Sequence, residues 1–179
     1  MSDRLTRVRV SRGSVAWFIG IVVVLGVVGV VCGLFWRSRI DVPHGVVVGG
    51  SWYPDPWDTG ERDSFASTGW YVLIALAVGV VLGVLAAWFS RASELVTLGA
   101  VLVGSLLAAW LMLRVGLHGA PADPQAAAAH AADGTRLSGT ISRPGRAAFV
   151  VWPLATLVPL GAIFLLLPER SSASSASRD

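Results

Sequence analysis

Side chains that could perform acid–base, nucleophilic or metal chemistry are few and scattered along this chain. The three histidines, His44, His118 and His130, have no spacing that brings neutral imidazoles together around a metal ion. A general acid–base pair would need His118 to meet Asp123, with a nucleophile beside them. The Gly-x-Ser-x-Gly, His-Glu-x-x-His and Gly-x-x-x-x-Gly-Lys patterns do not occur. We therefore expect no catalytic, cofactor-binding or metal-binding residues.

Acidic and aromatic residues gather in one segment, residues 51–63. Its carboxylates offer oxygen ligands for a hard cation, but the Gly-centred loop of an EF-hand is missing. The run Ser-Trp-Tyr-Pro-Asp-Pro-Trp-Asp at 51–58 fits either a ligand-binding lip or an interfacial loop whose rings rest on lipid headgroups. We favour the interfacial loop.

The composition excludes an ordinary soluble domain. Apolar residues make up 54% of the 179 residues, charged residues make up 14%, and the mean hydropathy is +0.67. Soluble domains carry about 25% charged residues. The net charge of +3 is dispersed, so no basic stripe suits nucleic acid. An integral membrane protein, with the lipid bilayer as its principal partner, is the expected class.

Four stretches are long and apolar enough to cross a bilayer as helices, which takes about 20 residues. They are residues 15–36, 69–89, 95–113 and 147–167. We predict an all-α membrane fold, a single four-helix transmembrane bundle over residues 15–167. Its outer segments, 37–68 and 114–146, are small and extracytoplasmic.

The first apolar stretch is expected to remain as a membrane helix. It is longer than the apolar core of a signal peptide, about 7–15 residues. A lipoprotein anchor at Cys32 would require a small residue before the cysteine, and Val31 stands there. With a single cysteine, the chain cannot form an internal disulfide.

Basic residues predict the orientation. The flanks on the terminal side (1–14, 90–94 and 168–179) and the outer segments each carry seven arginines, but the terminal side packs them into about half as many residues. We expect both termini in the cytoplasm, with a basic tail over 1–14 and a disordered tail over 168–179. Arg37 and Arg39 oppose this orientation.

Small residues at four-residue spacing predict the helix contacts, because close backbone approach drives association in lipid. The second and third spans are joined by a short turn and form a hairpin, and we expect their rows to face each other. The predicted packing residues are Gly29, Gly33, Ala75, Gly79, Gly83, Ala87, Ala100, Gly104 and Ala108.

Aromatic residues near the span ends predict the membrane boundaries, since indole and phenol rings favour the headgroup level. The predicted interfacial residues are Trp17, Trp36, Trp70, Tyr71, Trp88, Trp110 and Trp152.

The spans themselves contain no Asp, Glu, Arg or His. Ion-coupled transporters and proton relays place such groups at membrane depth. At membrane depth, the polar candidates are Ser105, Thr156 and the carbonyls freed by Pro153 and Pro159. A transport path through one copy is therefore disfavoured.

The second outer segment predicts a short helix. Asp123 is a suitable N-cap, Pro124 suits the first helical position, residues 125–132 are mostly alanine, and Gly134 is a stop. Residues 135–141 have strand character and are expected to pair with residues 46–48 in a small β-element.

The order of these features resembles a family of actinobacterial membrane proteins classed as a domain of unknown function. The likeness covers most of residues 69–167 and rests on Trp70-Tyr71, Asp123-Pro124, the Asp-Gly-Thr-Arg-Leu run at 133–137, and Trp152-Pro153-Leu154. The resemblance implies no activity and no site residue.

From these observations we predict a non-enzymatic plasma-membrane protein that supports the cell envelope or binds a partner, either another membrane protein or a second copy of itself. The alternative is a small transport-associated subunit that acts as an oligomer. An enzyme is the least favoured class.

Overall fold

The computed structural model describes residues 12–90 and 93–166. In this part of the chain, four helices are long and apolar enough to cross a membrane, as in a multi-pass membrane protein. They are α1 (Arg12–Arg37), α2 (Thr59–Trp88), α3 (Glu94–Gly116) and α5 (Arg146–Leu166). The four-helix prediction is confirmed. The predicted tails, apart from residues 12–14, lie outside the described residues.

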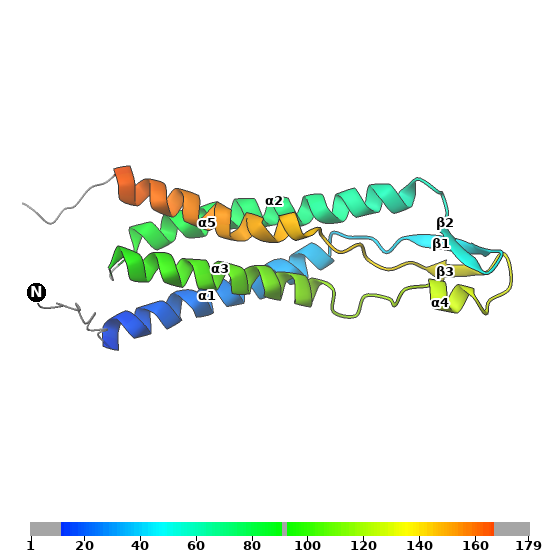
Figure 1. Ribbon diagram of the computed structural model, residues 1–179, viewed down its shortest axis with the longest axis horizontal. Coiled ribbons are helices and arrows are strands. Elements are labelled where there is room, and N and C mark those ends of the chain that lie inside the picture. The colour runs from blue at the N-terminus through cyan, green and yellow to red at the C-terminus, as the bar shows by residue number, and fades with distance from the viewer. Residues whose placement is uncertain (1–11, 91–92, 167–179) are drawn as a thin grey trace, which may run out of the picture.

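The four helices lie side by side, and a small module of strands and one helical turn projects from one end of the bundle (Figure 1). We call this the module end. α1 begins and α5 ends at the opposite end (Figure 1). Because the chain alternates in direction, α1 runs parallel to α3 and α2 runs parallel to α5.

The most extensive helix contacts join α1 to α3 and α2 to α5. A Cβ atom added at Gly29 would lie 2.6 Å from the Cα and carbonyl oxygen of Ala108, and one at Gly33 would lie 2.7 Å from the Met112 carbonyl oxygen. The same four-residue step separates the partners on both helices, as close parallel packing requires.

We call the close packing of α1 on α3 the first seam. The second seam joins α2 to α5. A Cβ added at Gly79 would lie 2.6 Å from the Ala155 Cβ, and one at Gly83 would collide with the Thr156 carbonyl oxygen and the Pro159 ring. The prediction that the rows of α2 and α3 face each other is therefore wrong. These helices are joined by a short turn but contact each other little, because each row packs against the parallel partner instead.

Helix α2 begins ten residues before the predicted span. The charged residues Glu61, Arg62 and Asp63 excluded this stretch from an apolar span, yet they lie in the first turns of the helix. The Arg62 guanidinium is 3.0 Å from the Asp58 carboxylate, one turn earlier. This first part of α2 is helical although it lies before the apolar span, and its charged side chains remain accessible to water.

The module contains a three-stranded antiparallel sheet and one helical turn. The strands β1 (His44–Val48), β2 (Ser51–Pro54) and β3 (Arg136–Ser138) are ordered β2-β1-β3. Gly45 pairs with Leu137, and Val46 pairs with Arg136, so the predicted β-element is confirmed. Gly49 and Gly50, with φ of 58° and 74°, form the two-residue hairpin turn between β1 and β2.

The predicted helix over residues 125–132 is shorter than expected. Only α4 (Gln125–Ala128) is helical, although the Asp123 carboxylate accepts a hydrogen bond from the Gln125 backbone N–H at 3.1 Å, as a capping residue should. The prediction that Gly134 stops this helix is wrong, because the helix is capped at Ala129 and Gly134, with a φ of 85°, lies beyond it at the start of the turn into β3. The chain turns into β3 because the N–H of Gly134 donates to the Val47 carbonyl at 2.8 Å.

Trp52 anchors this module. Its indole covers Gly45 and Gly139, and its Nε1 donates to the Leu137 carbonyl at 3.1 Å. The Gln125 side chain pairs with the Trp52 backbone through two hydrogen bonds, at 3.1 and 3.2 Å. The favoured interpretation of residues 51–58 as a loop with rings on headgroups is therefore wrong for Trp52, which lies in a strand and packs on the sheet.

Candidate functional site

Arginines collect where the bundle meets the module. Arg37 is the last residue of α1, Arg114 lies in the last turn of α3, and Arg143 precedes α5, which begins at Arg146. Cationic side chains at the carboxyl ends of helices are favourable because the helix dipole is negative there. The fold brings these three chain segments to the same end of the bundle.

Three of these arginines line one hollow of about 820 Å³. We call it the arginine groove. Its cationic walls are Arg37, Arg114 and Arg143, with His118 beside them. Its apolar surface comes from Leu34, Leu113 and Leu117. A volume of this size lies in the range of small-molecule sites.

The arginines of the groove form no ion pair with a carboxylate of the described residues. Over residues 12–90 and 93–166 the ion pair formed is Arg62–Asp58, away from the groove. Asp123 lies in an adjoining hollow with Arg143, where its carboxylate accepts the Gln125 N–H. Arg37 is half-buried, whereas Arg114 and Arg143 are exposed. The Arg114 guanidinium stacks 5.4 Å above the centre of the Trp110 ring, which fixes its position.

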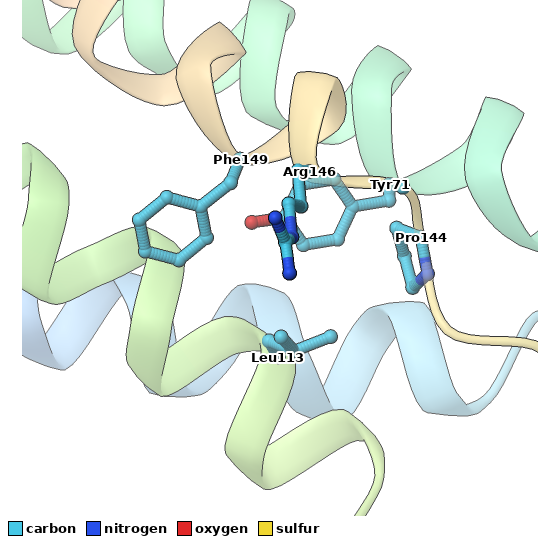
Figure 2. A pocket seen from close by; sticks show the side chains of 6 residues that line it. Tyr71, Leu113, Pro144, Arg146 and Phe149 are labelled. Atoms are coloured by element: carbon cyan, nitrogen blue, oxygen red, sulfur yellow. The ribbon is translucent and has the colours of Figure 1, made fainter.

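A smaller, mostly apolar pocket of about 230 Å³ lies next to the groove and shares Leu113 with it. Figure 2 shows the Arg146 side chain reaching from the start of α5 toward Leu113, between the rings of Phe149 and Tyr71. The Tyr71 hydroxyl donates to the Ala109 carbonyl at 3.2 Å and is therefore satisfied. Apolar groups line most of this pocket, and its polar side chains are those of Arg146 and Tyr71.

No protein-family model, no curated protein and no solved structure matches this chain. The resemblance to an actinobacterial membrane family stays a prediction, and the site has to be interpreted from its own chemistry.

The structure places the predicted packing residues on two different seams. Gly29, Gly33, Ala100, Gly104 and Ala108 lie between α1 and α3, where Gly104 contacts Leu25. Gly79 and Gly83 lie between α2 and α5, and Ala75 is fully buried on the same helix. Ala87, near the end of α2, is half-buried.

Three predicted interfacial aromatics are core residues instead. Trp36, Tyr71 and Trp152 are at most 1% exposed, and Trp36 and Tyr71 meet edge to face at 5.7 Å. Trp36 Nε1 donates to the Ser67 carbonyl at 2.9 Å, and Trp152 Nε1 donates to the Met112 sulfur at 3.3 Å. A buried indole needs an acceptor for its N–H, which explains these two hydrogen bonds. Through them and the ring contact, the three residues link all four helices at the module end.

The remaining predicted aromatics keep exposed or partly exposed rings. Trp70, Trp88 and Trp110 are 38%, 81% and 47% exposed, and Trp17 is half-buried. Trp70 shares the Arg39 guanidinium with Phe35, at 5.6 and 4.8 Å from the ring centres. Arg39 therefore lies between α1 and α2, apart from the arginine groove.

The three histidines lie in different segments of the fold. Within the described residues no group of three or more His, Cys, Asp or Glu comes together. His44 lies in β1, His118 follows α3 and His130 follows α4. The Ser105 hydroxyl donates to the Leu102 carbonyl, and the Thr156 hydroxyl donates to the carbonyls of Trp152 and Pro153.

Sequence reasoning missed the arginine groove. Its arginines entered the sequence analysis only as charges that bear on orientation. Arg114 and Arg143 stand 29 positions apart in the sequence, so spacing alone gave no signal that they meet. The available signal was their location directly after or before an apolar span on the same predicted side of the membrane.

Proposed function

We propose that this protein is a non-enzymatic plasma-membrane component that anchors a small β-module and binds a protein partner through it. The observation that carries the proposal is a set of aromatic side chains exposed beyond the apolar bundle. Trp57 is 83% exposed, Phe65 is 79% exposed and Tyr53 is 55% exposed.

Trp57 and Tyr53 lie too far along the molecule to be explained by the lipid interface, whereas Phe65 lies only two residues beyond Ser67, about 3 Å along the helix. The hydrogen bond from Trp36 to Ser67 sets the end of α1 level with residue 67 of α2. Residues 59–66 of α2 extend beyond that level by about 12 Å, at a rise of about 1.5 Å per residue. Trp57 precedes this extension, and Tyr53 lies in β2 of the module.

Large aromatic rings exposed to water are typical anchors of protein interfaces. Tryptophan and tyrosine dominate binding energies because they bury much apolar area with few rotatable bonds. The module, which carries Tyr53 and directly precedes Trp57, is held firmly, since Trp52, Gln125 and the β1–β3 pairing join segments from both sides of the hairpin. A rigid platform limits the entropy lost on binding.

The orientation belongs to the same proposal. With both termini in the cytoplasm, the module and its aromatics face the extracytoplasmic side, where a component of the cell envelope would meet its partner. The dense arginines of the terminal side support this orientation.

Site-specific photo-crosslinking in native membranes tests the proposed partner contact. A benzophenone side chain in place of Trp57 or Tyr53 should give a discrete protein adduct larger than the 18.8 kDa chain. The same side chain in place of Trp88, which is 81% exposed at the opposite end of the bundle, is the matched control and should give lipid adducts. Lipid adducts alone at all three positions would refute partner binding through the module.

A further inference from the structure

We propose that the arginine groove binds the phosphate headgroup of an anionic phospholipid. The proposal goes beyond partner binding through the β-module, because it concerns a separate surface at the module end of the bundle. It rests on the charge of the groove, its apolar surface and its level along the helices.

The charge favours an oxyanion. Arg37, Arg114 and Arg143 come from three separate chain segments and line one hollow, and no carboxylate of the described residues forms an ion pair with them. The helix dipole explains an arginine at the end of α1 or of α3, but it does not explain Arg143, which lies outside any helix. Guanidinium groups bind phosphate oxygens through paired N–H donors.

The apolar surface favours a lipid over a soluble phosphate. Leu34, Leu113 and Leu117 line the groove together with the arginines, and Leu34 is 59% exposed on the face of α1. A phosphodiester with attached acyl chains matches this combination, whereas a free phosphate ion leaves the leucine surface uncovered.

The level of the groove matches that of a headgroup. Trp110 is 47% exposed and stacks under Arg114, as expected of an aromatic residue at the boundary between lipid and water. Leu34 and Arg37, one turn apart on α1, place the apolar and cationic walls on either side of this boundary. A lipid held there would bridge the carboxyl ends of α1 and α3 and the segment that precedes α5.

Native mass spectrometry of the full chain in detergent, with added phosphatidylglycerol or phosphatidylcholine, tests the proposal. The wild type should retain phosphatidylglycerol in preference to phosphatidylcholine. The R114Q/R143Q variant should lose on the order of tenfold or more in phosphatidylglycerol affinity, because two charge-assisted contacts are removed. R114K/R143K keeps the charge without the forked donors and should lose less than R114Q/R143Q.

The matched control is R39Q/R136Q, which removes the same charge from positions outside the groove. Arg39 stacks on Phe35 and Trp70, and Arg136 is exposed in β3. This variant should bind phosphatidylglycerol as the wild type does. Equal losses in the two glutamine variants would indicate nonspecific attraction and overturn the proposal, as would unchanged binding by R114Q/R143Q.

Inorganic phosphate and glycerol phosphate distinguish the two sources of the anion. Neither should displace bound phosphatidylglycerol, because neither covers the leucine surface. Displacement by either at a concentration similar to that of the lipid would assign the groove to a soluble phosphate and overturn the lipid assignment.

Discussion

Replacing Gly29 with alanine should weaken the seam between α1 and α3. The added Cβ would lie 2.6 Å from both the Cα and the carbonyl oxygen of Ala108, and 3.0 Å from its carbonyl carbon. These are backbone atoms, so no side-chain rotation can relieve the contact. Normal van der Waals distances between carbon atoms are about 3.5–4.0 Å, so the two helices must separate by roughly 1 Å.

The expected effect follows from a comparison with Gly20 on the same helix, where an added Cβ would meet nothing within 4 Å. Alanine gains about 0.5–1 kcal/mol over glycine in a helix interior, and both substitutions share this gain. Overpacking adds a penalty of about 1–3 kcal/mol at Gly29 alone. The difference in unfolding free energy between Gly29→Ala and Gly20→Ala should therefore be about 1–3 kcal/mol.

Reversible unfolding in mixed micelles, followed by far-ultraviolet circular dichroism, measures this difference. Gly20→Ala should be at least as stable as the wild type, and Gly29→Ala should be less stable. Equal unfolding free energies for the two variants, within about 0.3 kcal/mol, would refute the parallel glycine seam.

Two further predictions concern the aromatic core and the orientation. Trp36→Phe removes the donor to the Ser67 carbonyl from a fully buried site and should destabilise the protein by about 1–3 kcal/mol, whereas Trp88→Phe, at a ring that is 81% exposed, should change stability by less than about 0.5 kcal/mol in the same assay. Similar losses for both would contradict the core assignment of Trp36. Cysteines introduced at Ser51 and Ser138 should react with an impermeant maleimide on intact cells in a chain lacking Cys32, and one at Ser174 should react only after permeabilisation. The reverse pattern would overturn the orientation.

The path of the chain through the bundle could be predicted because hydropathy is a local property. Residues 15–36 and 147–167 were expected as spans, and α1 and α5 cover Arg12–Arg37 and Arg146–Leu166. The start of α2 was missed because hydropathy reports burial in lipid, whereas a helix can continue into water with charged side chains such as Glu61 and Arg62.

The partners of each helix could not be predicted from the spacing of small residues. The spacing identified Gly79 and Gly83 correctly as residues with room for close approach, but any small-residue row can accept any neighbouring backbone. The short turn after α2 favoured α3 as the partner. In the fold, α5 occupies that row, because Ala155 and Thr156 fit against it.

The location of the aromatic residues along the chain likewise predicted only how far along each helix they lie. Trp36 and Trp152 lie near span ends, but the sequence does not show which way a ring points around its helix. Their rings point inward, where the Ser67 carbonyl and the Met112 sulfur accept the indole N–H groups.

Hydropathy and local backbone preferences were enough to predict four apolar helices and the strand segments of a small β-element, because both are local properties of the sequence. Tertiary structure decided the α1–α3 and α2–α5 seams, the buried aromatics and the convergence of Arg37, Arg114 and Arg143. These features depend on how helices rotate and pair in space. Segments far apart in the chain meet there through shape and hydrogen bonding, which no local pattern encodes.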